Sequence, residues 1–439
     1  MKIKNILRDY FILLSISVII FAFQFILRVE EPNYFICNEM KFYNYQLFNN
    51  SIEFLYPESC DQEAYHSGFS DLRNIFKEDF NYQARPLYFI PVNIIYNLLK
   101  IFNISETTNL LISTFLFQNI LALFVITILS DITSNKKNKQ INNFIIISLV
   151  ILLSPLFKWG LFDPSHQLLT FVVIIFFPYL LSKKVEINYS NAILIGLLFL
   201  LHRSFLIGYF WYLFISDYKN IFQHIRYRTK YFLFSLVPYI SYNLYFYLFL
   251  NQKPYDANSL YWGQFVWLYD FIRGKVRYQS EWHCVTIPKN FQCYLLDNLN
   301  TVMYIAIPIV LLIFNHLINN SKIKFKYNSY QYYVISLSIF IYVFWSFIGW
   351  YPPIRFSYYS IGNLIIVLFA LQLLNIENNL IKIITLSSYL SFTLYLNHWN
   401  DPNTVTINDG IYLSIYLSLF LAIITFFNKN KNKNKNRNK

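Results

Sequence analysis

The chain alternates between long apolar runs and short polar segments, and most of the runs match the length of a membrane-crossing helix. A bilayer core needs about 20 apolar residues per helix. The runs that fit lie at 10–27, 108–129, 143–157, 167–181, 229–250, 299–317, 330–349, 358–375, 379–396 and 409–427. The pattern predicts an all-α polytopic membrane protein with about 12 transmembrane helices.

Two apolar stretches leave the count open. The stretch 191–215 is interrupted by His202 and Arg203, so it is either one span or two short helices that meet at a polar turn. The stretch 84–102 begins with Arg85 and contains Pro91, so it is either a span or a helix beside the membrane.

The distribution of Lys and Arg favours one arrangement of these stretches. Short loops rich in Lys and Arg normally face the cytoplasm. The basic segments are the N-terminus and the loops around 136–139, 183–184, 226–228 and 322–326. All of them are cytoplasmic only if 84–102 lies along the outer surface and 191–215 crosses twice. In the alternative, two Lys-rich loops face outward.

The preferred topology predicts one transmembrane domain, 1–427, followed by a basic cytoplasmic tail, 428–439. Its two large outer loops are 28–83 and 251–298, and juxtamembrane helices are expected in the first. The first apolar run lacks a small-residue cleavage site, so we expect it to be a retained anchor.

Composition supports the membrane class and argues against nucleic-acid binding. The chain is 56% hydrophobic and 13% charged, whereas a soluble domain carries about 25% charged residues. Its net charge of +13 is spread over short segments between apolar runs, which is a topology signal and favours anionic lipid heads. The expected location is a bacterial inner membrane with a periplasmic or extracellular active face, or the endoplasmic reticulum membrane in a eukaryote.

All four cysteines fall in the predicted outer loops. Cys37 and Cys60 lie in the first loop, and Cys284 and Cys293 lie in the second. Four cysteines allow three pairings, and one disulfide per loop is the simplest. Disulfides indicate an oxidising compartment. A zinc site is the minor alternative.

The first outer loop carries side chains suited to acid–base and phosphate chemistry. Asp61 and Glu63 are followed by Arg85 at the start of an apolar stretch. A carboxylate accepts a proton from an attacking hydroxyl, and a guanidinium binds a phosphate with two parallel hydrogen bonds. By composition alone, solvated loop residues are the simpler interpretation.

Further residues stand at the predicted membrane boundary. Ser154 and Pro155 precede Asp163, which lies directly before a span. Arg203 separates two apolar halves, and Arg355 lies at the outer end of a span. A cation at membrane depth is costly unless it is paired or solvated, so both arginines are functional candidates.

Taken in order, these motifs resemble the GT-C superfamily of membrane glycosyltransferases, and most closely its protein-mannosyltransferase and lipid A aminoarabinose-transferase branch. That branch shows an Asp-Glu-x-x-Tyr stretch, then Arg-Pro-Pro-Leu-Tyr, then Ser-Pro and Asp-Pro. A Gly-Leu-x-x-Leu-x-Lys/Arg hairpin and a late Arg-Tyr follow. This chain has each motif in that order over roughly 10–375.

The chain departs from the pattern at three motifs. The acidic stretch reads Asp61-Gln62, with Glu63 displaced by one position. The hairpin ends in His202 and Arg203 instead of Thr-Lys, and Phe356 stands where a Tyr follows the late Arg. These departures leave open which carboxylate is the base, and whether the substrate differs or activity is lost.

The resemblance implies an enzyme of hexosyltransferase type that moves a sugar from a polyprenyl- or dolichyl-phosphate to a hydroxyl, with inversion. Asp61 would be the base, Glu63 its reserve, and Asp163 would position acceptor or sugar. The residues implied to bind substrate are Tyr65, Arg85, Arg203, Arg355 and Tyr358. Arg355 is the first choice for holding the leaving phosphate.

The implied partners are the lipid-linked sugar, an acceptor protein, lipid or glycan, and the bilayer. We expect no cofactor and no metal, although Asp61, Glu63 and Asp163 would offer oxygen ligands to a divalent ion. The alternative functions are a glycan polymerase or ligase that uses lipid-linked sugars, and a membrane transporter or flippase. The early acidic loop followed by Arg-Pro favours the transferase.

Overall fold

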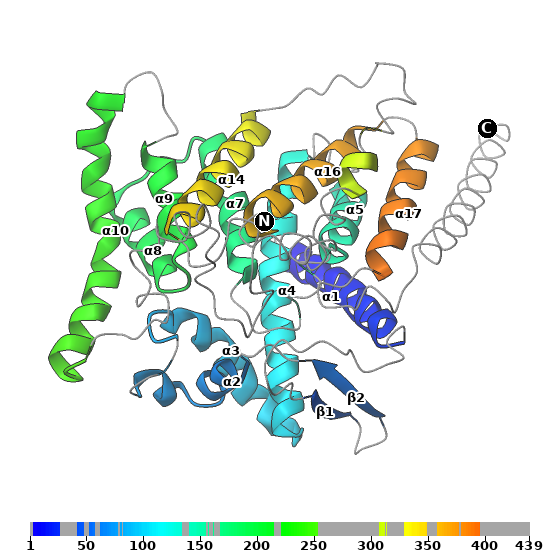
Figure 1. Cartoon of the computed structure of the whole chain (residues 1–439), viewed down its shortest axis with the longest axis horizontal. Coiled ribbons are helices and arrows are strands. Elements are labelled where there is room, and N and C mark those ends of the chain that lie inside the picture. The colour runs from blue at the N-terminus through cyan, green and yellow to red at the C-terminus, as the bar shows by residue number, and fades with distance from the viewer. Residues whose placement is uncertain are drawn as a thin grey trace, which may run out of the picture.

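A computed structural model describes the chain over most of its apolar runs (Figure 1). The described residues are 3–26, 42–47, 52–57, 62–77, 80, 82–133, 140–154, 157, 161, 167–214, 221–252, 307–311, 313, 329–348, 358–376 and 379–395.

Helices dominate this part of the chain. The α-helices are α1 (Ile3–Ile26), α2 (Gln62–Ser70), α3 (Pro86–Leu99), α4 (Glu106–Thr133), α5 (Gln140–Leu152), α7 (Gln167–Ser182), α8 (Tyr189–Phe199), α9 (Ser204–Phe214), α10 (Ile221–Phe249), α14 (Ser329–Ile348), α16 (Asn363–Asn375) and α17 (Asn379–Tyr395). The shorter helical turns are η1 (Leu72–Phe76), η2 (Lys100–Phe102) and η5 (Tyr358–Gly362).

The mostly helical architecture confirms the coarse form of the predicted fold class. An antiparallel hairpin of β1 (Phe42–Leu47) and β2 (Ile52–Pro57) was not predicted, and it pairs Phe42 with Pro57. By length and composition, two of the described helical segments are able to span a membrane, Thr108–Thr133 and Arg228–Phe249.

Helix α4 lies at the centre of the described structure. It is largely apolar, but a few of its polar side chains form hydrogen bonds to the neighbouring helices α1 and α3. The Ser17 hydroxyl of α1 donates to Asn119 Oδ1 at 2.6 Å. Asn109 Nδ2 donates to the Tyr96 carbonyl at 3.0 Å, and Gln118 Nε2 donates to the Tyr88 hydroxyl at 3.0 Å. Hydrogen bonds between helices are important in lipid, because lipid tails are as apolar as the side chains on the helix surface and burial of those side chains gives little driving force.

The same contacts fix the direction of α3. Tyr88 near its start meets Gln118, and Tyr96 near its end meets Asn109. Helix α3 therefore runs antiparallel to the first half of α4. Figure 1 shows α2, α3 and the β1–β2 hairpin gathered at the same end of the molecule. How 84–102 lies relative to a membrane stays a prediction.

The stretch 191–215 forms two helices, α8 and α9, that meet at the turn 200–203. Gly196 lets α8 approach α10 closely, because a Cβ at this position would collide with the carbonyl oxygen of Ser235. The predicted break at the polar turn is confirmed. Whether the two helices cross a membrane stays a prediction.

Candidate functional site

Arg85 is buried at the N-terminus of α3, with 3% of its surface exposed. Its backbone N–H donates to the Tyr82 carbonyl at 3.0 Å, which forms a tight turn just before Pro86 begins the helix. The guanidinium carbon lies 5.4 Å from the centre of the Tyr82 ring. A cation above an aromatic face is stabilised by the ring's negative surface, and this contact helps to compensate for the burial.

The turn between α8 and α9 lies directly beside this arginine. The Leu87 backbone N–H donates to the Leu200 carbonyl at 3.3 Å, which ties the first turn of α3 to the α8–α9 turn. His202 is buried, and its Nδ1 accepts from the Ser204 N–H at 3.2 Å. Arg203 follows it and is half-buried. We call Arg85, His202 and Arg203 the arginine junction.

The charges of the arginine junction act on one another. The guanidinium groups of Arg85 and Arg203 both lie near enough to His202 for their positive charges to act on its buried imidazole. The Nδ1 of His202 accepts a hydrogen bond from the Ser204 N–H, which fixes the orientation of the ring beside the two arginines. Two arginines that both act on one buried imidazole create a positive potential in a region of low dielectric constant.

Helix ends add to this potential. The Thr170 hydroxyl in the first turn of α7 lies 3.1 Å from the hydroxyl of Ser204, the first residue of α9. The start of α3 is tied to the same turn through Leu87. The N-termini of α3, α7 and α9 thus meet at the arginine junction. A helix N-terminus carries a partial positive charge and attracts anions.

An aromatic cluster connects the arginine junction to α2, the helix that begins in the acidic segment of the predicted first outer loop. Tyr65 of α2 is buried, and its ring stacks on Tyr82 at 4.3 Å between centres. It also meets Tyr88 edge-on at 5.7 Å. Since Tyr82 carries the Arg85 guanidinium on its ring, Tyr65 and Arg85 belong to one packed unit.

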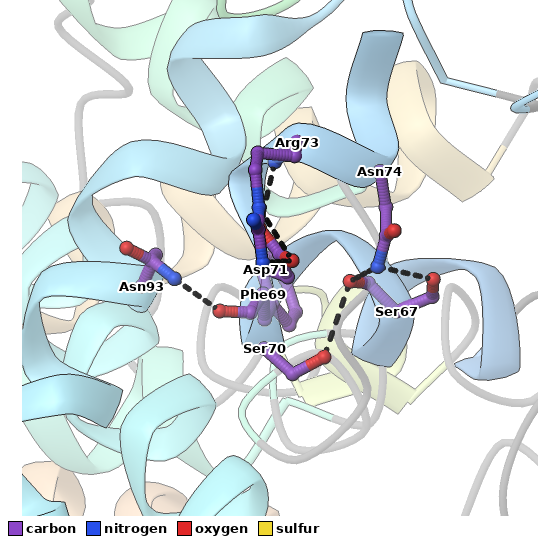
Figure 2. Close-up of polar contacts among 7 residues, drawn as sticks. All are labelled: Ser67, Phe69, Ser70, Asp71, Arg73, Asn74 and Asn93. Atoms are coloured by element: carbon purple, nitrogen blue, oxygen red, sulfur yellow. Dashed lines mark hydrogen bonds and ion pairs between the residues drawn. The ribbon is translucent and has the colours of Figure 1, made fainter. Parts of the chain in front are cut away.

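Backbone and side-chain hydrogen bonds hold α2 and η1 against α3 (Figure 2). Asn93 of α3 donates to the Phe69 carbonyl at 2.7 Å. Asn74 Nδ2 donates to the Ser67 carbonyl at 2.8 Å and to its hydroxyl at 3.0 Å. Asp71 caps η1 by accepting from the Arg73 N–H at 2.9 Å. The segment 62–77 is thus a folded unit attached to α3.

Asp71 is held ionised by its neighbour. Hydrogen bonds from the Arg73 side chain, then from its backbone N–H, lower the pKa of Asp71 to about 2. Both side chains are exposed to solvent, so this pair supports the turn locally and contributes little to global stability.

The structure brings together some of the predicted site residues. Tyr65, Arg85 and Arg203 converge as described. Glu63 belongs to the first turn of α2 and Tyr358 opens η5, although their side chains are outside the described part of the structure. Ser154 is buried at the end of α5, where its hydroxyl donates to the Ile151 carbonyl at 2.7 Å, a structural role.

Other predicted residues lie outside the described residues, and their predictions stand untested. They are Asp61, Asp163, Arg355 and the four cysteines Cys37, Cys60, Cys284 and Cys293. Within the part of the chain that the structure describes, no group of three or more His, Cys, Asp or Glu side chains is placed to hold a metal ion.

Several contributors to the site were not singled out from the sequence. Tyr82 stands in a chain with 38 tyrosines, so composition hides it. Tyr88 closes the Arg-Pro motif, but the sequence predicts no contact for it. Thr170 is one hydroxyl in an apolar helix. A usable signal for Tyr82 was its place three residues before Arg85, since this spacing closes a turn and brings the ring under the guanidinium.

Comparisons with known proteins add no identification. No family model matches the chain, and no curated protein or solved structure is detectably similar to it.

Proposed function

We propose that this chain is a multi-pass membrane glycosyltransferase that transfers a sugar from a polyprenyl- or dolichyl-phosphate to an acceptor hydroxyl on the non-cytoplasmic face. The arginine junction is the observation that carries the proposal. It gathers two arginines and three helix N-termini at one buried place. That place joins the Arg-Pro helix to the α8–α9 hairpin, which are two of the five motifs that carry the likeness to GT-C enzymes.

The charge at the arginine junction suits a phosphate leaving group. When the bond between the anomeric carbon and the phosphate oxygen breaks, the electron pair stays on the phosphate and its negative charge grows. Fixed cations and helix N-termini that already point at the phosphate stabilise this charge without reorganisation. Arg85 and Arg203 supply the fixed charge. Arg355 and Tyr358 remain predicted phosphate and sugar contacts.

The acidic segment is attached to the arginine junction by the aromatic cluster. Tyr65 lies in α2, the helix that Asp61 precedes and that includes Glu63, and Tyr65 stacks on the Tyr82 ring that supports Arg85. In the proposed reaction, Asp61 takes the proton from the acceptor hydroxyl as its oxygen attacks the anomeric carbon. Glu63 is the second candidate for this base, and Asp163 positions a substrate.

The ends of the helices support the proposed orientation. Lys183 pairs with Asp131 at 2.8 Å where α7 and α4 end, and Arg228 donates to the Leu213 carbonyl at the end of α9. Along α4, Gln118 near the arginine junction and Asp131 are about 20 Å apart. The basic ends thus gather on one side and the arginine junction lies toward the other, as the positive-inside pattern requires.

The proposal is tested by reconstituting the purified chain with labelled polyprenyl-phosphate sugars and mixed acceptors. We expect release of polyprenyl phosphate by the wild type. Asp61→Asn and Arg85→Gln should each lower the rate at least tenfold, since a general base or a charge contact contributes about that much or more. We call residues 62–77, which pack on α3, the outer segment. Arg73→Gln is the matched control, because this exposed arginine belongs to the outer segment but not to the arginine junction.

The outcomes separate the parts of the proposal. Equal loss in Arg73→Gln would show that any cation of the outer segment matters, and the arginine junction would lose its special role. A normal rate in Asp61→Asn would move the base to Glu63. A folded wild type that releases no polyprenyl phosphate from any donor would refute the transferase.

A further inference from the structure

Helix α10 contacts the chain on both sides of the arginine junction. On one side, its Ser235 carbonyl packs against Gly196 of α8, the helix that leads into the His202–Arg203 turn. On the other side, the Tyr242 hydroxyl donates to the Gln83 carbonyl at 2.7 Å, two residues before Arg85. One helix thus contacts both Gln83, two residues before Arg85, and α8, the helix that leads into the turn of Arg203. Together with the Leu87–Leu200 hydrogen bond, α10 therefore helps to set the spacing between the two arginines.

The Tyr242 hydrogen bond acts on a backbone with little freedom of its own. The Gln83 N–H donates to the Phe80 carbonyl at 3.3 Å and the Arg85 N–H donates to the Tyr82 carbonyl at 3.0 Å. Gln83 itself is buried, and its side chain donates to the Lys77 carbonyl. Because successive turns connect Gln83 to Arg85, a displacement of the Gln83 carbonyl is transmitted to the guanidinium.

Apolar contacts place the same part of α10 beside the outer segment. Phe246, one turn after Tyr242, is buried and stacks on Phe76 at 5.7 Å between ring centres. Tyr245 also meets Phe76, edge-on at 6.2 Å, but 44% of its surface is exposed. These ring contacts hold α10 against η1, and the Tyr242 hydroxyl adds a directed contact at the turn that carries Arg85.

We propose that Tyr242 is a positioning residue, whose hydroxyl fixes Arg85 at the spacing from Arg203 that binds a prenyl phosphate. This inference rests on the proposed function, because it assigns the arginine junction to a phosphate. Since α10 leads directly into the segment 251–298, it also connects that predicted outer loop to the arginine junction.

The test measures the affinity of the purified full-length chain in detergent for radiolabelled farnesyl phosphate. Tyr242→Phe removes one hydroxyl and keeps the ring, and Tyr245→Phe makes the same change on the exposed side of the same helix. We expect Tyr242→Phe to weaken binding about fivefold, the usual effect of one hydrogen bond. Tyr245→Phe should bind as the wild type does.

A double variant separates positioning from general support of the fold. In an Arg85→Gln background, Tyr242→Phe should cause no further loss, because the group that it positions is gone. Equal affinities of Tyr242→Phe and Tyr245→Phe for farnesyl phosphate would overturn the inference. It would also be overturned if Tyr242→Phe lowered the affinity by the same factor in the wild type and in the Arg85→Gln variant. Equal binding by wild type and Arg85→Gln would refute the phosphate site itself, and the positioning role with it.

Discussion

At the scale of single residues, several buried amides connect helices instead of carrying chemistry. Asn93 joins α3 to α2, while Asn109 and Gln118 join α4 to α3. Asn119 accepts from Ser17 of α1. In an Asn-rich chain these positions cannot be told apart by type from exposed ones. Only the packing shows which amides bear structural hydrogen bonds.

His66 of α2 makes a pH-dependent contribution to the outer segment. Burial lowers its pKa from 6.5 to about 4, so the folded chain favours the neutral imidazole. The unfolded segment binds the proton more readily. The stability that His66 contributes is therefore fully present above pH 6.5 and is lost as the pH falls toward 4.

We predict that the thermal unfolding midpoint of the wild type decreases as the pH is lowered from 6.5 to 4. In His66→Gln this decrease in unfolding temperature should be smaller. Glutamine keeps a polar, uncharged side chain, so the variant removes the titration with little change in size. Thermal unfolding of the detergent-purified chain across this pH range checks the prediction. Parallel curves for the two proteins would contradict it.

At the scale of elements, the close contact of α8 with α10 depends on one missing side chain. A Cβ at Gly196 would meet the backbone of Ser235, which cannot move without displacing α10. Gly208 of α9 offers a comparison, because a Cβ there would meet the side chains of Phe177 and Val173, and side chains adjust more easily than backbone.

We predict that Gly196→Ala destabilises the chain by about 1–3 kcal/mol, the usual cost of overpacking. Gly208→Ala should cost less, because a ring can turn away. Because α10 also supports Arg85, Gly196→Ala should weaken farnesyl phosphate binding as well. Chemical denaturation and the binding assay together check this pair, and a larger loss of stability in Gly208→Ala would reverse the argument.

Sequence pattern predicted the helical class and the break at His202 and Arg203, because apolar runs and a polar interruption are local signals. It missed the β1–β2 hairpin, whose strands carry no simple alternation in an aromatic-rich loop. It also did not predict that Tyr82 supports Arg85. That contact depends on a turn whose direction comes from packing against α2 and α10.

At the scale of the whole molecule, charge separates along the helices. Lys183, Arg228 and exposed Lys184 gather where α7, α9 and α10 meet. Arg73 lies in η1, within the segment 62–77 that packs on α3. In the proposed membrane orientation these two ends face opposite compartments.

We predict that Arg73→Cys is labelled by a membrane-impermeant maleimide in intact cells, and that Lys184→Cys is labelled only after the membrane is opened. Both residues are exposed, so accessibility depends on the side of the membrane. The wild type supplies the background from native cysteines. Labelling of both variants from the same side would refute the orientation.

The hydrogen bond between Leu87 and Leu200 also sets an order of events during synthesis. At about 5–20 residues per second, roughly 6–23 s pass between translation of these two residues. The contacts of Tyr65, Tyr82 and Asn93 are local to the first outer segment and α3, so they form while the ribosome is still extending the chain. The first segment is therefore already packed on α3 when the α8–α9 hairpin arrives, and the position of Arg85 is fixed last, when α10 brings Tyr242 to the Gln83 carbonyl.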